Sequence, residues 1–316
     1  MQLFFHHLEL CAPLFLLVFL GWGTVKVGMF DKAVSSGLSK FVFKLLMPVM
    51  LFQMMSHLSD EMPPVDWRVL IAFFGSCIVV FALGRQLGKR VFHQDSTGQV
   101  ITGMGGIFGN NVQLGVPIVQ VSLGNAAIPT ISLIIIFNVL LLWTAATACV
   151  EFGRTGGHVD TKKFVRALFN IFKNPIVLGI VLGSCWGLTG WHLPGVIDKT
   201  LGWVSAATTP AALIAVGMAL AQRSFKAALP KGCLISALKL VVQPLIVYAL
   251  CRVIGLGELQ TNATTLLSCL PVAINLYIMS NEFESEEAAA SNAIFVSTLI
   301  SAVTVPLTLA LLGAGI

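Results

Sequence analysis

Charged residues are scarce in this sequence. Asp, Glu, Lys and Arg make up 10% of the 316 residues, whereas hydrophobic residues make up 56% and the mean hydropathy is +0.89. A soluble domain usually carries about 25% charged residues, so this composition excludes an ordinary soluble domain. Apolar stretches of about 20 residues recur along the chain, which fits membrane helices better than the roughly 10-residue alternating strands of a barrel. The sequence predicts an all-α integral protein of the lipid bilayer.

Motifs for metals, cofactors and nucleic acids are also lacking. The seven Cys occur singly, without the paired spacing of a zinc or redox motif, and fit buried, inert thiols. The His residues cluster near the chain start and in loops, and none has metal-ligand spacing. The net charge of +5 is explained by basic loops and needs no nucleic-acid partner. We therefore expect no metal and no cofactor.

Ten apolar segments are long enough to cross a bilayer as helices. Their bounds are soft by several residues. They lie at about 8–28, 35–58, 67–92, 97–123, 126–150, 164–190, 195–221, 228–254, 260–281 and 286–312.

The distribution of Lys and Arg sets the orientation, because cytoplasmic loops are enriched in them. Fifteen of these residues, including Lys40 and Lys44, are assigned to odd-numbered loops. Only Arg68, Lys199 and Arg252 are assigned to even-numbered loops, and Lys239 remains inside a span. This predicts a multi-pass protein of the cell (inner) membrane, with odd-numbered loops in the cytoplasm and both termini outside it.

An even number of spans with a basic loop in the middle suggests two halves. Residues 1–150 form a first repeat of five helices, 151–163 a cytoplasmic linker, and 164–316 a second repeat. Because five is odd, the second repeat is inverted relative to the first. Pro48 and Pro210 are 162 residues apart, and Pro117 and Pro271 are 154 apart, both near half the chain length. Paired broken helices in inverted repeats are typical of secondary transporters; the alternative is a chance pairing of prolines.

The fourth segment contains a polar stretch, Gly109-Asn-Asn-Val-Gln-Leu-Gly-Val-Pro117, in otherwise apolar surroundings. Proline has no N–H and clashes with the preceding turn, so we expect the helix to break at Pro117 and to free the carbonyl of Gln113. Broken backbone at membrane depth is tolerated only where it is buried in protein or lines a wet cavity. Asn110, Asn111 and Gln113 suit such a cavity, which makes this stretch the candidate binding site.

The ninth segment contains a matching break at Pro271, with Asn275 about one helical turn further on. The half-helix after each proline should present free N–H groups and a positive dipole end, where a carboxylate fits without a formal protein charge. The alternative is that Asn111 and Asn275 only satisfy freed carbonyls and neighbouring helices.

Lys239 is the one basic residue deep inside an apolar segment, in the stretch 235–244. Its insertion costs about 2.5–3.5 kcal/mol, so a functional role is the default hypothesis. We expect it to compensate the charge of an anionic substrate or to take part in proton coupling. Snorkelling to an interface is the alternative, although the nearest span end is roughly ten residues, or about 15 Å, away.

Two further amides are candidates because their neighbours are apolar. Asn138 in the fifth segment is placed to face the crossover, and Gln53 in the second segment could face it from the other side. A lone amide between helices is often only a packing contact, which is the alternative for both.

Several stretches resemble the auxin efflux carrier family, which includes bacterial malonate-transporter-like members and plant PIN proteins. They are Asn110-Asn111 with Leu114-Gly-Val-Pro117, Leu270-Pro-Val-Ala273, Asn281-Glu-Phe-Glu284, Ser297-Thr-Leu-Ile-Ser301 with Val305-Pro-Leu307, and Lys239 with Pro244.

The resemblance covers essentially the whole chain. It implies ten helices, a crossover of spans 4 and 9 at their prolines, a scaffold of spans 1, 2, 6 and 7, and a mobile part of spans 3–5 and 8–10 that moves as an elevator. It also implies a homodimer through the scaffold. The loop at 151–163 is short, whereas the plant plasma-membrane members carry a long one, and this favours a bacterial organic-acid carrier over an auxin carrier.

The sequence thus predicts a secondary active transporter for a small organic anion, such as malonate or an auxin-like acid, and not an enzyme. An anion channel is the first alternative, because paired half-helices can line a pore. An intramembrane enzyme is the second, because Ser236 and Lys239 are spaced as a Ser–Lys dyad on one helix. Coupling to protons or to sodium stays open.

Overall fold

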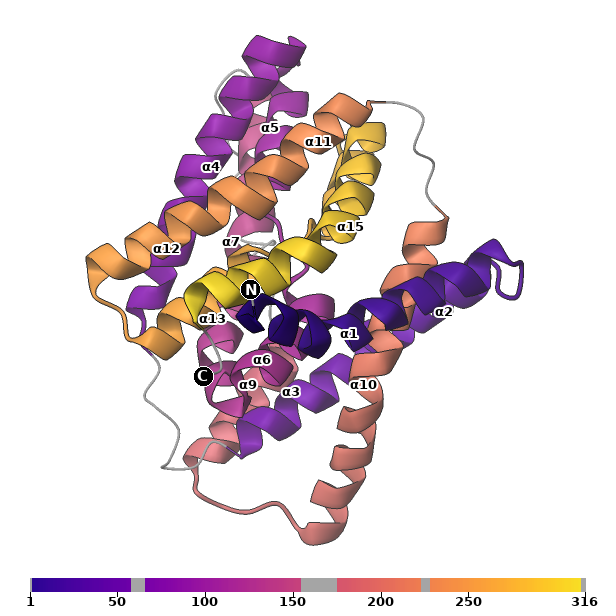
Figure 1. Cartoon of the computed structure of the whole chain (residues 1–316), viewed down its shortest axis with the longest axis vertical. Coiled ribbons are helices and arrows are strands. Elements are labelled where there is room, and N and C mark those ends of the chain that lie inside the picture. Colours follow the sequence, from indigo (N-terminus) through magenta and orange to yellow (C-terminus); the bar gives the residue numbers. More distant parts are fainter. Residues whose placement is uncertain (1, 58–65, 155–174, 223–227, 314–316) are drawn as a thin grey trace.

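The computed structural model describes residues 2–57, 66–154, 175–222 and 228–313. Within these ranges the chain consists of helices and their connections, with one isolated antiparallel bridge between Gly109 and Val272 (Figure 1). The all-α prediction is confirmed for this part of the chain.

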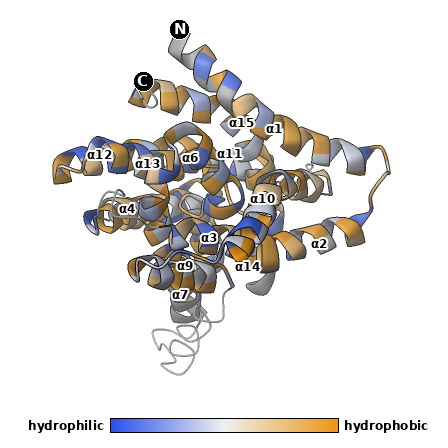
Figure 2. Ribbon diagram, turned by 90° about the horizontal axis from the view of Figure 1, so that it is seen from below, coloured by the Kyte–Doolittle hydropathy of each residue, from blue (hydrophilic) through white to orange (hydrophobic). Residues whose placement is uncertain are grey.

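Several helices have the length and composition of membrane spans. Among the described residues, five segments reach the length and hydropathy needed to cross a bilayer, and four shorter apolar helices accompany them. Figure 2 shows hydrophobic residues along most of the long helices. These segments indicate a multi-pass membrane protein. The exact number of ten spans stays a prediction. The five segments are Lys32–Ser56, Arg68–Phe92, Gly195–Ala221, Leu229–Ile254 and Glu287–Leu312.

The helices of the first half follow the predicted apolar segments with small shifts at their ends. They are α1 (Gln2–Lys26), α2 (Lys32–Phe41), η1 (Val42–Leu46), α3 (Met47–Ser56), α4 (Arg68–Phe92), α5 (Ser96–Gly105), η2 (Asn111–Gly115), α6 (Val116–Leu123), η3 (Asn125–Ala127) and α7 (Ile128–Arg154).

The helices of the second half also follow the predicted apolar segments. They are α9 (Pro175–Leu188), α10 (Gly195–Ala221), α11 (Leu229–Ala237), η4 (Leu238–Val242), α12 (Gln243–Ile254), α13 (Glu258–Ser268), α14 (Asn275–Glu282) and α15 (Glu287–Leu312). Because α7 continues to Arg154, it includes the first residues of the predicted linker 151–163. The rest of that linker and the expected start of the sixth span at 164 lie outside the described residues.

Three prolines are accommodated by widened helical turns. The π-helical turns η1, η2 and η4 directly precede the α-helices in which Pro48, Pro117 and Pro244 occupy the first turn. A proline ring clashes with the carbonyl four residues earlier in an α-helix, and a wider turn relieves that clash. The chain therefore remains helical through Pro117, and the prediction that it breaks there was wrong.

The breaks lie elsewhere in the same two segments. In the fourth segment α5 ends at Gly105 and helical structure resumes at Asn111, before Pro117. In the ninth segment α13 ends at Ser268 and α14 begins at Asn275, so Pro271 does lie in a break. Asn111 and Asn275 thus occupy matching positions, each as the first residue of a second half-helix, whereas Pro117 and Pro271 do not match.

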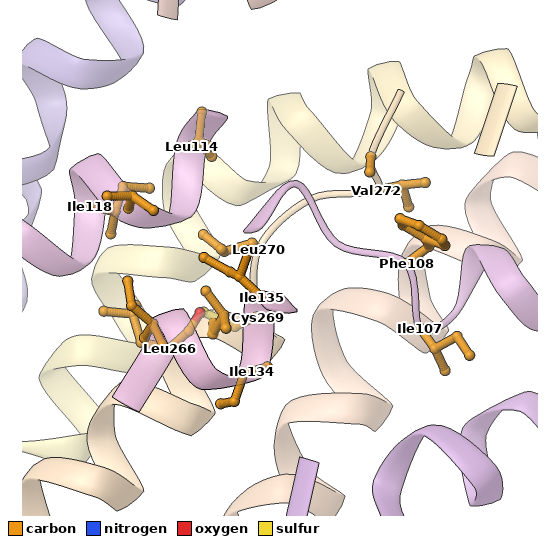
Figure 3. Close-up of a cluster of buried hydrophobic side chains, with 14 of the residues drawn as sticks. Ile107, Phe108, Leu114, Ile118, Ile134, Ile135, Leu266, Cys269, Leu270 and Val272 are labelled. Atoms are coloured by element: carbon orange, nitrogen blue, oxygen red, sulfur yellow. The ribbon is translucent and has the colours of Figure 1, made fainter. Parts of the chain in front are cut away.

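The two breaks bind each other through their backbones. Asn110 N–H donates to the Pro271 carbonyl at 2.8 Å, and Ala273 N–H donates to the Phe108 carbonyl at 2.9 Å. The N–H of Val272, between these contacts, donates to Ser297 Oγ of α15 at 3.0 Å. Figure 3 shows Phe108 beside Val272, with a cluster of apolar side chains around Leu270. Backbone groups that the helices release are in this way satisfied inside the protein, as the bilayer requires.

Close helix contacts are made at small residues in two pairs. In the pair α1 and α10, a Cβ added at Gly217 would lie 1.8 Å from the Val18 carbonyl oxygen. In the pair α3 and α9, a Cβ added at Gly179 would lie 2.4 Å from the Pro48 carbonyl oxygen. Glycine is therefore required at both positions for the backbones to approach this closely. The first pair joins predicted span 1 to span 7, and the second joins predicted span 2 to span 6. An inverted repeat of five spans would map each of these pairs onto the other.

A second group of helices, α4, α5, α11, α12, α13 and α15, packs together (Figure 1). The main contacts within it are α4 with α5, α12 with α4, and α11 with α15. The two groups contact each other mainly through α1 and α15.

We expect Ser297→Ala to reduce the free energy of unfolding by about 1–3 kcal/mol, because the buried N–H of Val272 loses its acceptor. Thermal unfolding of the purified protein in detergent measures this. Ser301→Ala is the matched control, since Ser301 Oγ is buried on the same helix and donates to a carbonyl of that helix, Thr298, at 2.7 Å. Equal losses in the two variants would show that Ser297 does not support the break.

Candidate functional site

A cavity of about 350 Å³ lies between the two breaks and the neighbouring helices α2, η1, α7 and α10. Its volume falls in the range of small-molecule sites, about 300–1,000 Å³. Five of the residues that the sequence proposed for the binding site line this cavity: Asn110, Asn111, Gln113, Asn138 and Asn275.

Asn111 is the most unusual residue of the cavity. Its side chain is 3% exposed, and both Nδ2 and Oδ1 are buried without a hydrogen-bond partner among the described residues. Asn138 is 4% exposed and its Oδ1 is in the same situation. A buried polar atom without a partner costs about 1–3 kcal/mol, so such amides point to a ligand that completes their hydrogen bonds.

The backbone around Asn111 favours an anionic ligand. Asn111 begins the half-helix η2–α6, and Asn275 begins α14 on the other side of the crossover. The first turn of a helix presents N–H groups and a partial positive charge, and both first turns face the same cavity. The amides and the two helix ends together form a polar, weakly positive site suited to a carboxylate.

Lys239 lies directly behind the first break and not in the cavity wall. The residue is fully buried in η4, and its Nζ donates to Gln243 Oε1 at 2.7 Å and to the Ser268 carbonyl. A Cβ added at Gly109 would lie 2.7 Å from Asn111 Oδ1 and 3.0 Å from Lys239 Nζ. These two atoms are therefore within about 6 Å of each other, close enough for the ammonium to act on an anion held at the amide.

The contacts of Lys239 also give it a structural task. Ser268 is the last residue of α13, so the ammonium binds a carbonyl at the negative end of that half-helix. Snorkelling to an interface is inconsistent with a fully buried side chain whose acceptors are both internal.

Three residues proposed for the site, Gln53, Pro117 and Pro271, do not line the cavity. Gln53 is directed to the start of α10, where its Nε2 is 3.4 Å from both the carboxylate and the carbonyl of Asp198. His57 binds the same carboxylate at 2.8 Å. Gln53 therefore joins α3 to α10 and does not line the cavity. Pro117 and Pro271 do not line it either, and they act through the backbone.

The structure adds two cations that the sequence reasoning assigned to a loop. Lys40 is in α2 and Lys44 is in η1, and both line the cavity. The signal was present in the sequence, because the two lysines are four residues apart and so share one face of a helix. It was missed because a basic residue near a span end also fits a cytoplasmic flank.

The geometry does not support a catalytic Ser–Lys dyad. Ser236 Oγ donates to the Gly232 carbonyl at 2.8 Å and is also within hydrogen-bond distance of the Ala293 carbonyl, so it does not pair with Lys239. Among the described residues no three His, Cys, Asp or Glu side chains are placed to hold a metal ion.

Comparison with known proteins covers almost the whole chain. Residues 6–309 match a family model described as membrane transport protein. The chain is 26% identical over 311 residues to a putative malonate transporter of Rhizobium meliloti, covering 97% of this chain and 96% of the relative.

Two further relatives come from other organisms. An alignment of 360 positions with auxin efflux carrier component 8 of Arabidopsis thaliana shows 24% identity and covers 97% of this chain and 96% of the relative. An uncharacterized transporter of Methanocaldococcus jannaschii is 23% identical over 302 residues, covering 92% and 94%.

We expect Lys239→Met to lower the midpoint of thermal unfolding as well as ligand binding, because the Ser268 carbonyl and Gln243 lose a buried donor at about 1–3 kcal/mol each. Thermal unfolding in detergent checks the first effect. Lys231→Met on α11 is the control: its ammonium pairs with Glu286 at 2.6 Å in a partly exposed ion pair, worth about 0–1 kcal/mol. A Lys239→Met variant as stable as the control would limit Lys239 to an electrostatic role.

Proposed function

The chain belongs to this family of membrane transport proteins, and from that premise we propose that it is a secondary active transporter of a small organic anion. Its relatives are transporters and not enzymes, and the same holds for this chain. The observation that supports the anionic cargo most directly is Asn111, which lines the cavity at the first turn of a half-helix and whose buried amide is unpaired within the described part of the chain.

A carboxylate meets the requirements of this site better than a neutral solute. Asn111 Nδ2 and the first turns of η2–α6 and α14 supply donors, and Lys239 supplies positive charge from behind Gly109. An uncompensated carboxylate would be expensive to carry through a dry membrane interior. In this proposal Lys239 compensates the negative charge of the cargo. Coupling of transport to protons or to sodium at the same site is a further part of the proposal.

We propose an elevator-type movement for alternating access. The helices α1, α2, α3, α9 and α10 would be the scaffold, and the group with α4, α5, α11, α12, α13 and α15 would carry the crossover. The close contacts within each group and the cavity between them support this division, and α1 with α15 is the main contact that crosses it. A homodimer through the scaffold completes the proposal.

We propose that the cavity opens toward the cytoplasm. Lys40 and Lys44, in its wall, follow the first predicted cytoplasmic loop. In the proposed orientation this conformation therefore faces inward.

Asn111→Ala should abolish transport while the protein remains folded. The Ala variant removes the amide that we propose to bind the cargo. It leaves no other group without a partner, because both amide atoms already lack partners in the described part of the chain. Uptake and counterflow of a labelled carboxylate in proteoliposomes at equal protein loading measure the loss.

Asn262→Ala on α13 is the control, because Asn262 is also buried but does not line the cavity. An uptake rate of the Asn111 variant within about twofold of the wild type would remove Asn111 from the site. Counterflow driven by unlabelled solute also separates a carrier from a channel, because an open pore cannot couple one solute to another.

For orientation, we expect a Cys introduced at His192 to react with an impermeant thiol reagent on intact cells, and one at Gly157 to react only after permeabilisation. His192 is exposed between α9 and α10 in a predicted outer loop, and Gly157 is in the predicted cytoplasmic linker, outside the described residues. A background without native Cys is required. The reverse labelling pattern would invert the proposed topology.

A further inference from the structure

Two lysines in the cavity wall have no role in binding a single carboxylate at Asn111. Lys40 and Lys44 lie one turn apart on α2 and η1, and each contributes to the same cavity as Asn111. They belong to a different helix from the crossover, so the cavity has a positive wall separate from its amide wall.

The position of these lysines in the membrane is informative. Both lie within Lys32–Ser56, a segment apolar and long enough to span a bilayer. A Lys inside a span is costly unless it faces protein or water, and such a residue is by default a functional candidate. Both residues are exposed and line the cavity, which is where a charged side chain of a membrane segment can reach water.

Within the described ranges, no protein carboxylate balances the two ammonium groups. The cavity lining found there contains no Asp or Glu, and the ion pairs among the described residues involve neither Lys40 nor Lys44. Two cations four residues apart on one helix repel each other, and an anion between them removes that repulsion. The wall is therefore suited to a second negative group, held in addition to the one at Asn111.

We propose that Lys40 and Lys44 form a second carboxylate subsite, so that the site prefers a small dicarboxylate dianion over a monocarboxylate. The inference rests on the proposed function, because it takes the first carboxylate to bind at Asn111 and the half-helix ends. A lysine ammonium is a flexible, strongly hydrated point charge, which suits the wet side of the cavity. The dianion bridges the two groups of helices, one carboxylate on each.

The test compares malonate with its monomethyl ester, which keeps the three-carbon diacid backbone but replaces one carboxylate by a neutral ester. The pH is chosen so that malonate carries two negative charges and the ester one. Dissociation constants are measured for the purified protein in detergent, and counterflow is measured in proteoliposomes. For the double variant Lys40→Gln/Lys44→Gln we expect the Kd of malonate to rise about tenfold or more, which is about 1.4 kcal/mol. The Kd of the ester should stay within about twofold.

Two variants make the result specific. Lys32→Gln removes one charge at the start of the same helix but away from the cavity lining, and it should leave both probes unchanged. Lys40→Arg/Lys44→Arg keeps both charges and should retain the preference for malonate. Thermal unfolding of each variant confirms that the protein is folded.

The outcomes separate this inference from the proposed function. If the wild type binds both probes equally, or the double Gln variant weakens both by the same factor, the second subsite is wrong and carboxylate transport stands. If the wild type binds neither probe and Asn111→Ala changes nothing, the proposed function fails together with the subsite. A selective loss of malonate binding in the double Gln variant supports the inference.

Discussion

The rest of the structure depends on one constraint, which is that backbone groups at membrane depth must find hydrogen-bond partners inside the protein. The chain leaves its helix at 106–110 and again at 269–274. Each break alone would expose unpaired N–H and C=O groups to lipid. Together they form an antiparallel pair at Gly109 and Val272, and Ser297 satisfies one further N–H. The two halves of the protein are therefore joined by the same groups that interrupt their helices.

The crossover also creates the chemistry of the site. Where a helix restarts, its first turn carries positive potential, and two restarts face one cavity in this fold. Asn111 adds an amide that the described part of the chain leaves unpaired, and Lys239 adds charge from behind Gly109, where an added Cβ would lie 3.0 Å from its Nζ. Lys239 holds the end of α13 as well, so the residue that supports the crossover also tunes its charge. Stability and anion binding are consequently difficult to separate at this position.

The division into two groups of helices gives the cavity two different walls. The crossover wall is neutral but rich in amides and helix ends, whereas the α2–η1 wall carries exposed lysines. In the proposed function, a cargo with one charge would be held by the crossover wall only. The proposed dianion would contact both walls, so its binding would depend on the relative position of the two groups of helices, which the proposed elevator movement would change.

The sequence by itself determined the helical membrane class and the approximate helix positions, because hydropathy depends only on local composition. It also identified five residues that line the cavity, because a polar residue in an apolar run can be recognised locally. They are Asn110, Asn111, Gln113, Asn138 and Asn275. The tertiary structure alone decided where the helices break and what each polar side chain faces. Proline predicted a break at 117, but a π turn absorbs its clash, and the pairing with the second break sets the position instead. Gln53 and the lysines on α2 and η1 were misassigned for the same reason: a side chain's environment is set by segments distant in the chain, such as Asp198 for Gln53.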